Sequence, residues 1–245
     1  MEHRNFQLDT EWNIIHYPER PKGFGILILG DERNFVDEKS SFWIQNEGKK
    51  ALLRTLKREG YTVFYSNLYG KNWGSQKAVN LAKRLYNHIM RTEIINDRIH
   101  LLAEGMGALT AIKLMVELKQ NIRSVILLNP ILSLSHHLEY EKERKFFYKK
   151  LLKELAGAYE TEPKEIEKII LSDKILTEFH SGHPVKIIYI LSRNQNFSQR
   201  NLLDDLSTKW ENEDSSISKT YLIPEKQQQL ANQIVRFMNE HEKIL

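Results

Sequence analysis

Residues 104–107, with the sequence Glu-Gly-Met-Gly, place a carboxylate beside two backbone amides that suit an anion. The amides belong to Met106 and Gly107, which begin an apolar helical pattern, and the first amides of a helix have no acceptor within it. The partial positive charge at a helix start adds to their attraction for a carboxylate, phosphate or sulfate group. Glu104 could instead act as a general base on water, although we expect its side chain to point away from the amides.

The elements around this turn are a buried strand and a helix. Residues 99–103 are a short apolar run, and residues 108–118 carry apolar side chains at helical spacing. A sharp turn between such elements usually needs a residue with positive φ, a conformation that glycine adopts at almost no steric cost. We therefore expect Gly105 to have a positive φ at the carboxyl end of a central strand.

The same glycines, with Thr110 or Ala111, form a degenerate G-x-G-x-x-G dinucleotide motif. That motif belongs on the first strand of its fold, with an acidic residue about twenty positions later at the end of the next strand. Here it follows several strands, and the next strand ends in Asn129-Pro130. We expect no dinucleotide and no other cofactor.

Further polar side chains fall on loops at the expected carboxyl ends of strands, where α/β proteins form their sites. Asp31, Glu32, His136 and His137 are of this kind, and a glutamate–histidine pair can activate water. Their ordinary structural role is to be solvated or to begin helices. Adjacent histidines rarely face one ion, and no H-x-x-x-H spacing is present, so no metal site is predicted.

Composition indicates a globular chain large enough for one α/β domain with an insertion. The 245 residues are 41% hydrophobic and 28% charged, and 36 basic residues against 32 acidic ones give a net charge of +4. Basic and acidic residues are interleaved, which argues against a nucleic-acid partner. The chain has no cysteine, no apolar leader at its start and no run of membrane-spanning length. We therefore expect a cytoplasmic protein without a membrane partner.

Strands alternate with helices along most of the chain, which predicts a mostly parallel sheet covered on both faces. A hairpin around Asp9-Thr10 comes first. The other expected strands span 23–30, 61–70, 99–103, 123–130, 185–191 and 218–224. The expected helices span 40–58, 75–91, 108–118, 139–159, 162–171, 173–179, 201–213 and 228–241.

This order of elements resembles that of the α/β-hydrolase superfamily over essentially the whole chain. The nucleophile elbow of that superfamily reads G-x-S-x-G between a strand and a helix, and residues 103–107 fill its slots here. Gly105 stands where the serine is expected. Leu29-Gly30 takes the place of a frequent histidine–glycine pair, and residues 67–75 loosely match an aspartate- and glycine-rich loop of the family.

The resemblance also implies positions for a catalytic acid and a histidine base, and neither is filled. The acid position after strand 185–191 holds Asn194, Gln195 and Asn196, and the alternative after Asn129 offers only serines. Residues 224–228, between the last strand and the last helix, contain no histidine, and His241 is too far along that helix. The resemblance thus implies that the protein is a hydrolase homologue without the Ser-His-Asp triad.

The resemblance implies a three-layer α/β sandwich with a mostly parallel sheet, a core of residues 1–132 and 184–245, and a helical cap over 133–183. The expected function is to bind a small ligand, with an anionic ligand as one option, or a protein partner. The alternative is hydrolysis of a small ester or acyl substrate by a non-standard set of groups, with Glu104 as the first candidate. The oligomeric state is not predicted. The expected pocket residues are Gly30, Asp31, Trp73, Ser75, Gly105, Met106, Asn129, His136, Asn194 and Gln227.

Overall fold

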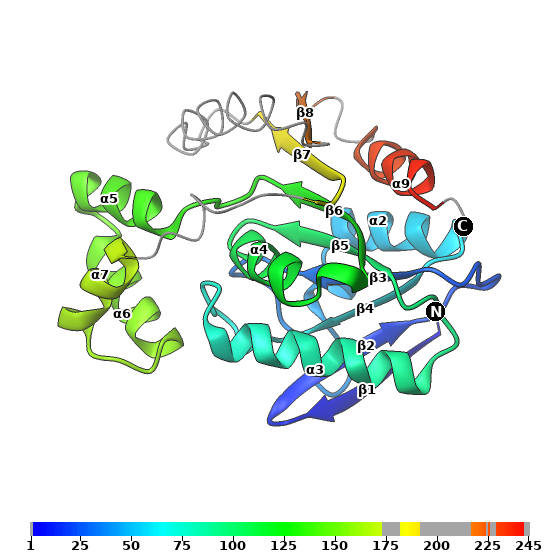
Figure 1. The fold of residues 1–245 in the computed structure, drawn as a ribbon, viewed down its shortest axis with the longest axis horizontal. Coiled ribbons are helices and arrows are strands. Elements are labelled where there is room, and N and C mark those ends of the chain that lie inside the picture. The colour runs from blue at the N-terminus through cyan, green and yellow to red at the C-terminus, as the bar shows by residue number, and fades with distance from the viewer. Residues whose placement is uncertain (1, 173–181, 192–216, 224, 226–228, 243–245) are drawn as a thin grey trace.

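An open, eight-stranded sheet forms the centre of the molecule (Figure 1). The computed structural model describes residues 2–172, 182–191, 217–223, 225 and 229–242. The strands lie in the order β1-β2-β4-β3-β5-β6-β7-β8; β2 is antiparallel to both of its neighbours, and all other pairs are parallel. They are β1 (His3–Leu8), β2 (Glu11–His16), β3 (Gly25–Leu29), β4 (Thr62–Ser66), β5 (Ile99–Glu104), β6 (Ile122–Leu128), β7 (Val185–Ile190) and β8 (Ile217–Leu222).

The first two strands form the predicted hairpin. Asp9 has a φ of 61° in the turn between them, and aspartate tolerates this left-handed conformation better than most residues. The parallel strands β3 and β6 are buried at every position, as expected for strands that helices cover on both sides, whereas the edge strand β8 is partly exposed.

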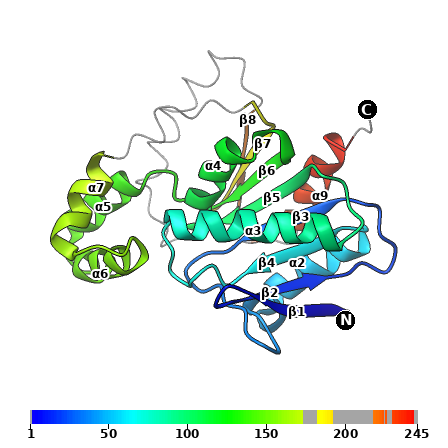
Figure 2. The same cartoon turned by 60° about the horizontal axis from the view of Figure 1, so that its bottom comes forward.

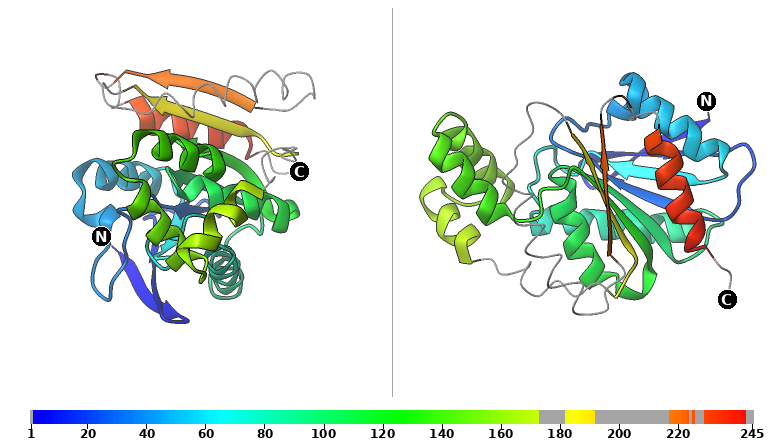
Figure 3. Two further views of the ribbon diagram at one scale, coloured as in Figure 1. Left: turned by 90° about the vertical axis from the view of Figure 1, so that its left-hand side faces the viewer. Right: turned by 90° about the horizontal axis from the view of Figure 1, so that it is seen from above.

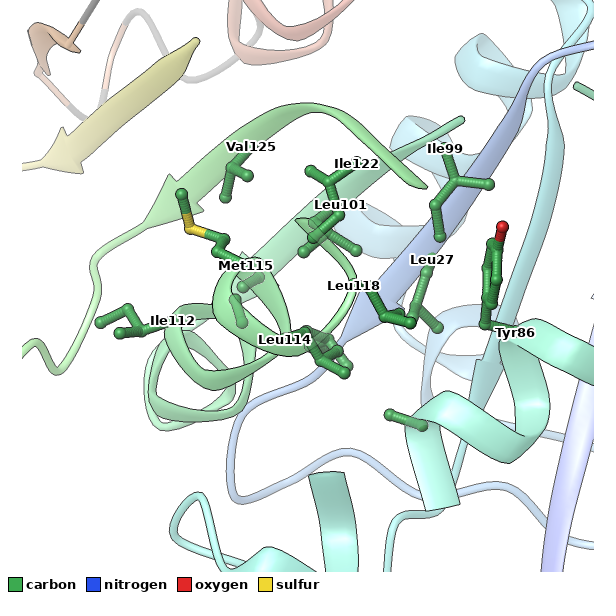
Figure 4. Packing of buried hydrophobic residues seen from close by; sticks show 14 of the residues in the cluster. Leu27, Tyr86, Ile99, Leu101, Ile112, Leu114, Met115, Leu118, Ile122 and Val125 are labelled. Carbon is green, nitrogen blue, oxygen red and sulfur yellow. The ribbon is translucent and has the colours of Figure 1, made fainter. Parts of the chain in front are cut away.

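Helices cover both faces of the sheet and make three layers (Figures 2 and 3). On one face lie α3 (Gln76–Thr92) and α4 (Gly107–Glu117), which is followed by the short helix η1 (Lys119–Asn121). On the other face lie α2 (Glu47–Arg58) and α9 (Leu230–Glu240). Apolar side chains of α4 interlock with those of β3, β5 and β6 (Figure 4). The predicted three-layer sandwich is confirmed.

The prediction of a single helix over residues 40–58 is wrong, because the chain forms two helices there, α1 (Phe42–Gln45) and then α2. Asn46 separates them with an extended backbone, at φ −81° and ψ 120°. Its side-chain oxygen accepts a hydrogen bond from the backbone N–H of Lys49, so Asn46 caps α2 as a preferred N-cap residue.

Three helices, α5 (Leu134–Arg144), α6 (Tyr148–Ala158) and α7 (Pro163–Ser172), stand beside the sheet after β6 (Figure 1). The one long helix expected over 139–159 is interrupted at Lys145, whose φ of 63° lies in the left-handed region. The three helices share an apolar core with Trp73 and Met106 of the main body. The helices expected over 173–179 and 201–213 lie outside the described residues, and the limits of the cap remain a prediction.

Among the residues described, no helix is both long and apolar enough to cross a membrane.

Candidate functional site

The turn between β5 and α4 has the predicted geometry. Gly105 has a φ of 52° and follows β5, which has four strands on one side of it in the sheet order and three on the other. Its amide donates to the Leu128 carbonyl, and its own carbonyl accepts from Ile131, so the turn is fixed to the end of β6. Gly107 lets α4 approach β3 closely, since a Cβ there would overlap the carbonyl oxygen of Leu29.

The carboxylate of Asp31 lies in the space beside Gly105 that a side chain at that position would occupy. A Cβ built on Gly105 would overlap both oxygens of this carboxylate. Asp31 comes from the turn after β3, and its Oδ1 accepts a 3.0 Å hydrogen bond from the backbone N–H of Met106. The anion expected at the start of α4 is thus supplied by the chain itself, and an external anion would have to displace Asp31.

Glu104 points away from this place, as expected. Side chains alternate between the two faces of a strand, and Glu104 lies on the face covered by α2. Its carboxylate accepts from the Lys49 ammonium group at 2.5 Å, and both side chains are partly exposed. An ion-paired carboxylate on that face cannot serve a reaction beside Gly105.

A cavity of about 270 Å³ lies between the cap helices and the turn that holds Asp31. Its lining includes Asp31 and Trp73, which are two of the predicted pocket residues. The residues lining it are Asp31, Glu32, Trp73, Ile131, His137, Glu141, Phe147, Lys150, Leu151 and Glu154.

Trp73 forms one wall of this cavity and is fixed on several sides. Its indole N–H donates to a Glu154 oxygen at 3.3 Å, and the His137 ring stacks on it at a centroid distance of 5.6 Å. Burial, together with the neighbouring His136, lowers the pKa of His137 to about 4. His137 is therefore neutral at pH 7 and is a weak base.

Several predicted pocket residues are structural and do not line this cavity. Gly30 packs against the Asn34 side chain, and Ser75 is a buried residue at the start of α3. Met106 offers its amide to Asp31, while its side chain lies in the core shared with the cap. Asn129, with a φ of 42°, accepts a hydrogen bond from the Ile190 amide and so joins β6 to β7.

His136 lies in α5, where its amide donates to Ser133, the N-cap residue of that helix. It does not line the cavity; its neighbour His137 does. Asn194 and Gln227 lie outside the described residues.

Cap residues of the cavity were missed because nothing in the sequence distinguishes them. Glu141, Lys150 and Glu154 belong to helical segments whose charged residues are typical of a solvated face. Their position at the cavity follows from the break at Lys145, which folds α6 back against α5.

A serine, a histidine and a glutamate do meet in this protein, but not at the cavity. His100 Nδ1 lies 2.8 Å from Ser124 Oγ, and His100 Nε2 lies 3.4 Å from a Glu242 oxygen. His100 and Ser124 are completely buried near the amino ends of β5 and β6, opposite the Gly105 turn. Without access to a substrate, this group serves as a buried polar network.

Metal binding has no support among the residues that the structure describes, where no three histidine or acidic side chains converge. The prediction of no metal site and no cofactor remains a prediction for the whole chain.

Solved structures share this architecture over nearly the whole chain, although the sequences are very different. No family model matches the sequence. No curated protein matches it either. Est1E from Butyrivibrio proteoclasticus aligns with a TM-score of 0.68 and 11% identity, covering 98% of both chains. The Pyrococcus furiosus esterase Pf2001 aligns with a TM-score of 0.69 and 15% identity, covering 98% of this chain and 93% of that one. FphF, the fluorophosphonate-binding serine hydrolase F of Staphylococcus aureus, aligns with a TM-score of 0.66 and 12% identity, covering 97% of this chain and 98% of that one.

The chain therefore has the α/β-hydrolase fold, with an open, mostly parallel sheet. At such low identities the likeness shows the fold alone. A shared fold does not determine function, which depends on the residues of the site.

Proposed function

We propose that this protein is an α/β-hydrolase homologue without a catalytic triad, and that it binds a small ligand or a partner without hydrolysing it. The observation that carries the proposal is the Asp31 carboxylate beside Gly105. This carboxylate fills the space that a nucleophile side chain would occupy. It also accepts the hydrogen bond of the Met106 amide, a donor that would otherwise stabilise the oxyanion of a tetrahedral intermediate.

The sequence supports the same proposal at two further positions. The segment between β8 and α9, residues 223–229, contains no histidine, and residues 191–197 after β7 contain no carboxylate. A serine nucleophile needs a histidine within hydrogen-bond reach and an acid that orients it.

We expect the purified protein to be inert towards a fluorophosphonate probe and towards a panel of p-nitrophenyl esters. The fluorophosphonate-binding serine hydrolase F of Staphylococcus aureus is a suitable positive control, treated in parallel. Labelling is measured by intact-protein mass spectrometry. Stoichiometric labelling of any serine would refute the proposal.

Restoring a serine alone should not restore turnover. Gly105→Ser brings its Cβ against Asp31, so the informative variant is Gly105→Ser combined with Asp31→Ala, which makes room for the new side chain. Without a base we expect ester hydrolysis roughly 10⁶-fold below that of an intact triad enzyme. Rapid turnover by the double variant would reveal a base that the proposal denies.

The second candidate function is hydrolysis of a small ester or acyl substrate by a non-standard set of groups. One observation favours it, because Asp31, Glu32 and His137 line the same cavity. Two observations oppose it: His137 has a pKa of about 4, and Glu104 is bound to Lys49 outside the cavity. Turnover in the wild-type protein that falls in both Asp31→Asn and His137→Gln would favour this second function.

A further inference from the structure

Glu141 is a buried residue whose carboxylate has no counterion among the described residues. It lies in the carboxyl-terminal half of α5, lines the cavity and is only 8% exposed. Among the described residues, no donor forms a hydrogen bond or an ion pair with its side chain. Its oxygens are not among the described polar atoms that are both fully buried and without a partner, so they reach the open space of the cavity, where a ligand can meet them.

The other carboxylates of the cavity are already engaged. Asp31 accepts from the Met106 amide, and Glu32 lies 3.3 Å from the Lys71 ammonium group. Glu154 accepts from Lys71 at 2.6 Å and from the Trp73 indole. Glu141 is thus the carboxylate left to meet a ligand.

The charge around the cavity favours a cation. Among the described residues, four carboxylates line it but only one ammonium group, that of Lys150; Lys71 is not part of the lining and pairs with Glu32 and Glu154. His137 adds no charge at pH 7, because burial lowers its pKa. An excess of negative charge in a confined space concentrates cations and repels anions.

The remaining lining suits an organic ion better than a bare metal. Trp73, Ile131, Phe147 and Leu151 provide apolar and aromatic surface, and aromatic faces attract organic cations. The described side chains contain no group of three that could hold a metal ion. A cavity of about 270 Å³ is just below the usual range for drug-sized ligands, so the ligand is small.

We propose that the cavity under α5 and α6 binds a small organic cation, an amine or quaternary ammonium ion, with Glu141 as its counterion. This inference rests on the proposed non-catalytic binding function and names the ligand class. It also replaces the anionic ligand that the sequence predicts, since Asp31 already occupies the anion position.

The test is a binding titration of the full chain with matched charged and neutral probes. Choline is compared with its neutral isostere 3,3-dimethylbutan-1-ol, butylamine with butan-1-ol, and acetate serves as the anion. We expect choline, butylamine or both to bind and raise the melting temperature, and the alcohols and acetate to have no effect. The two cations separate a quaternary ammonium ligand from one that must donate hydrogen bonds. Equal responses to a cation and its neutral isostere would overturn the inference.

The variant Glu141→Gln keeps the size of the side chain and removes its charge. We expect it to weaken binding of the active cation by roughly 30-fold or more, because one member of a buried charge pair is lost. Glu143→Gln, on the exposed side of the same helix, is the matched control and should leave cation binding unchanged. Undiminished cation binding by Glu141→Gln would contradict the proposed counterion.

The outcome is separable from that of the proposed function. Cation binding is measured without any reaction, and fluorophosphonate labelling is measured without any cation. If the chain is inert to the probe and no cation binds, the ligand class is wrong and the non-catalytic function stands. If a serine is labelled, the non-catalytic function is wrong whatever the cations do.

Discussion

Replacing Gly107 with alanine is expected to destabilise the native state by at least about 3 kcal/mol, more than a typical single substitution. The added Cβ would overlap the carbonyl oxygens of Leu29 and Gly30, which are backbone atoms. The end of β3 has little freedom to move away, because Leu29 pairs with Ala103 of the central strand β5. Urea denaturation monitored by circular dichroism measures the change in the free energy of unfolding.

Gly157→Ala is the matched control for this prediction. Gly157 lies near the end of α6, and a Cβ there meets nothing within 4 Å. Alanine should stabilise the protein by roughly 0.4–1 kcal/mol, since it reduces the freedom of the unfolded chain. A loss of similar size in both variants would show that α4 and β3 are not in close contact.

The backbone of the site was predictable because it follows from local rules. A short apolar run, small residues and a helical pattern around Gly105 are sufficient to predict the strand, the turn and its positive φ. The order of strands and helices likewise predicts the three layers, since each element has to bury its apolar face.

The chemistry of the site was not predictable, because it depends on contacts between distant segments. Asp31 and Gly105 are far apart in sequence, and only the pairing of β3 with β5 brings their loops together. Glu141 has the type and spacing of a solvated helix residue, and only the fold of α6 against α5 buries it. Tertiary packing of this kind leaves no periodic signal in the sequence.

The two helix breaks show a similar limit. Both Asn46 and Lys145 interrupt patterns that are continuous in their apolar spacing. Asparagine is a common cap, so the first break carries a weak signal. Lysine has no preference for the left-handed region, so the second break is imposed by the packing of the cap.

His16 should make the protein sensitive to mild acid. The side chain is completely buried in β2, with its Nε2 atom 2.9 Å from the Tyr65 hydroxyl. Burial, with smaller contributions from His3 and Lys57, lowers its pKa from 6.5 to about 3. In the unfolded chain, His16 is protonated below about pH 6.5, whereas in the folded chain it stays neutral down to about pH 3. The free energy of unfolding therefore falls as the pH drops through this window. The loss between pH 7 and pH 5 from this residue alone is about 2 kcal/mol.

The variant His16→Phe isolates this contribution. Phenylalanine cannot titrate but can keep the stacked contact with Tyr65, whose hydroxyl retains its 2.7 Å hydrogen bond with Ser41. Urea denaturation at pH 7 and pH 5 should show a smaller loss in the variant than in the wild type, by about 2 kcal/mol. His88→Phe is the control; His88 is partly exposed, so most of the pH dependence should remain after its removal. Burial also lowers the pKa of other histidines, His100 and His137 among them. They contribute equally to the pH dependence of the wild type and of His16→Phe, so their contributions cancel when the two proteins are compared. An unchanged pH dependence in His16→Phe would mean that His16 is protonated, or accessible to protons, in the folded protein.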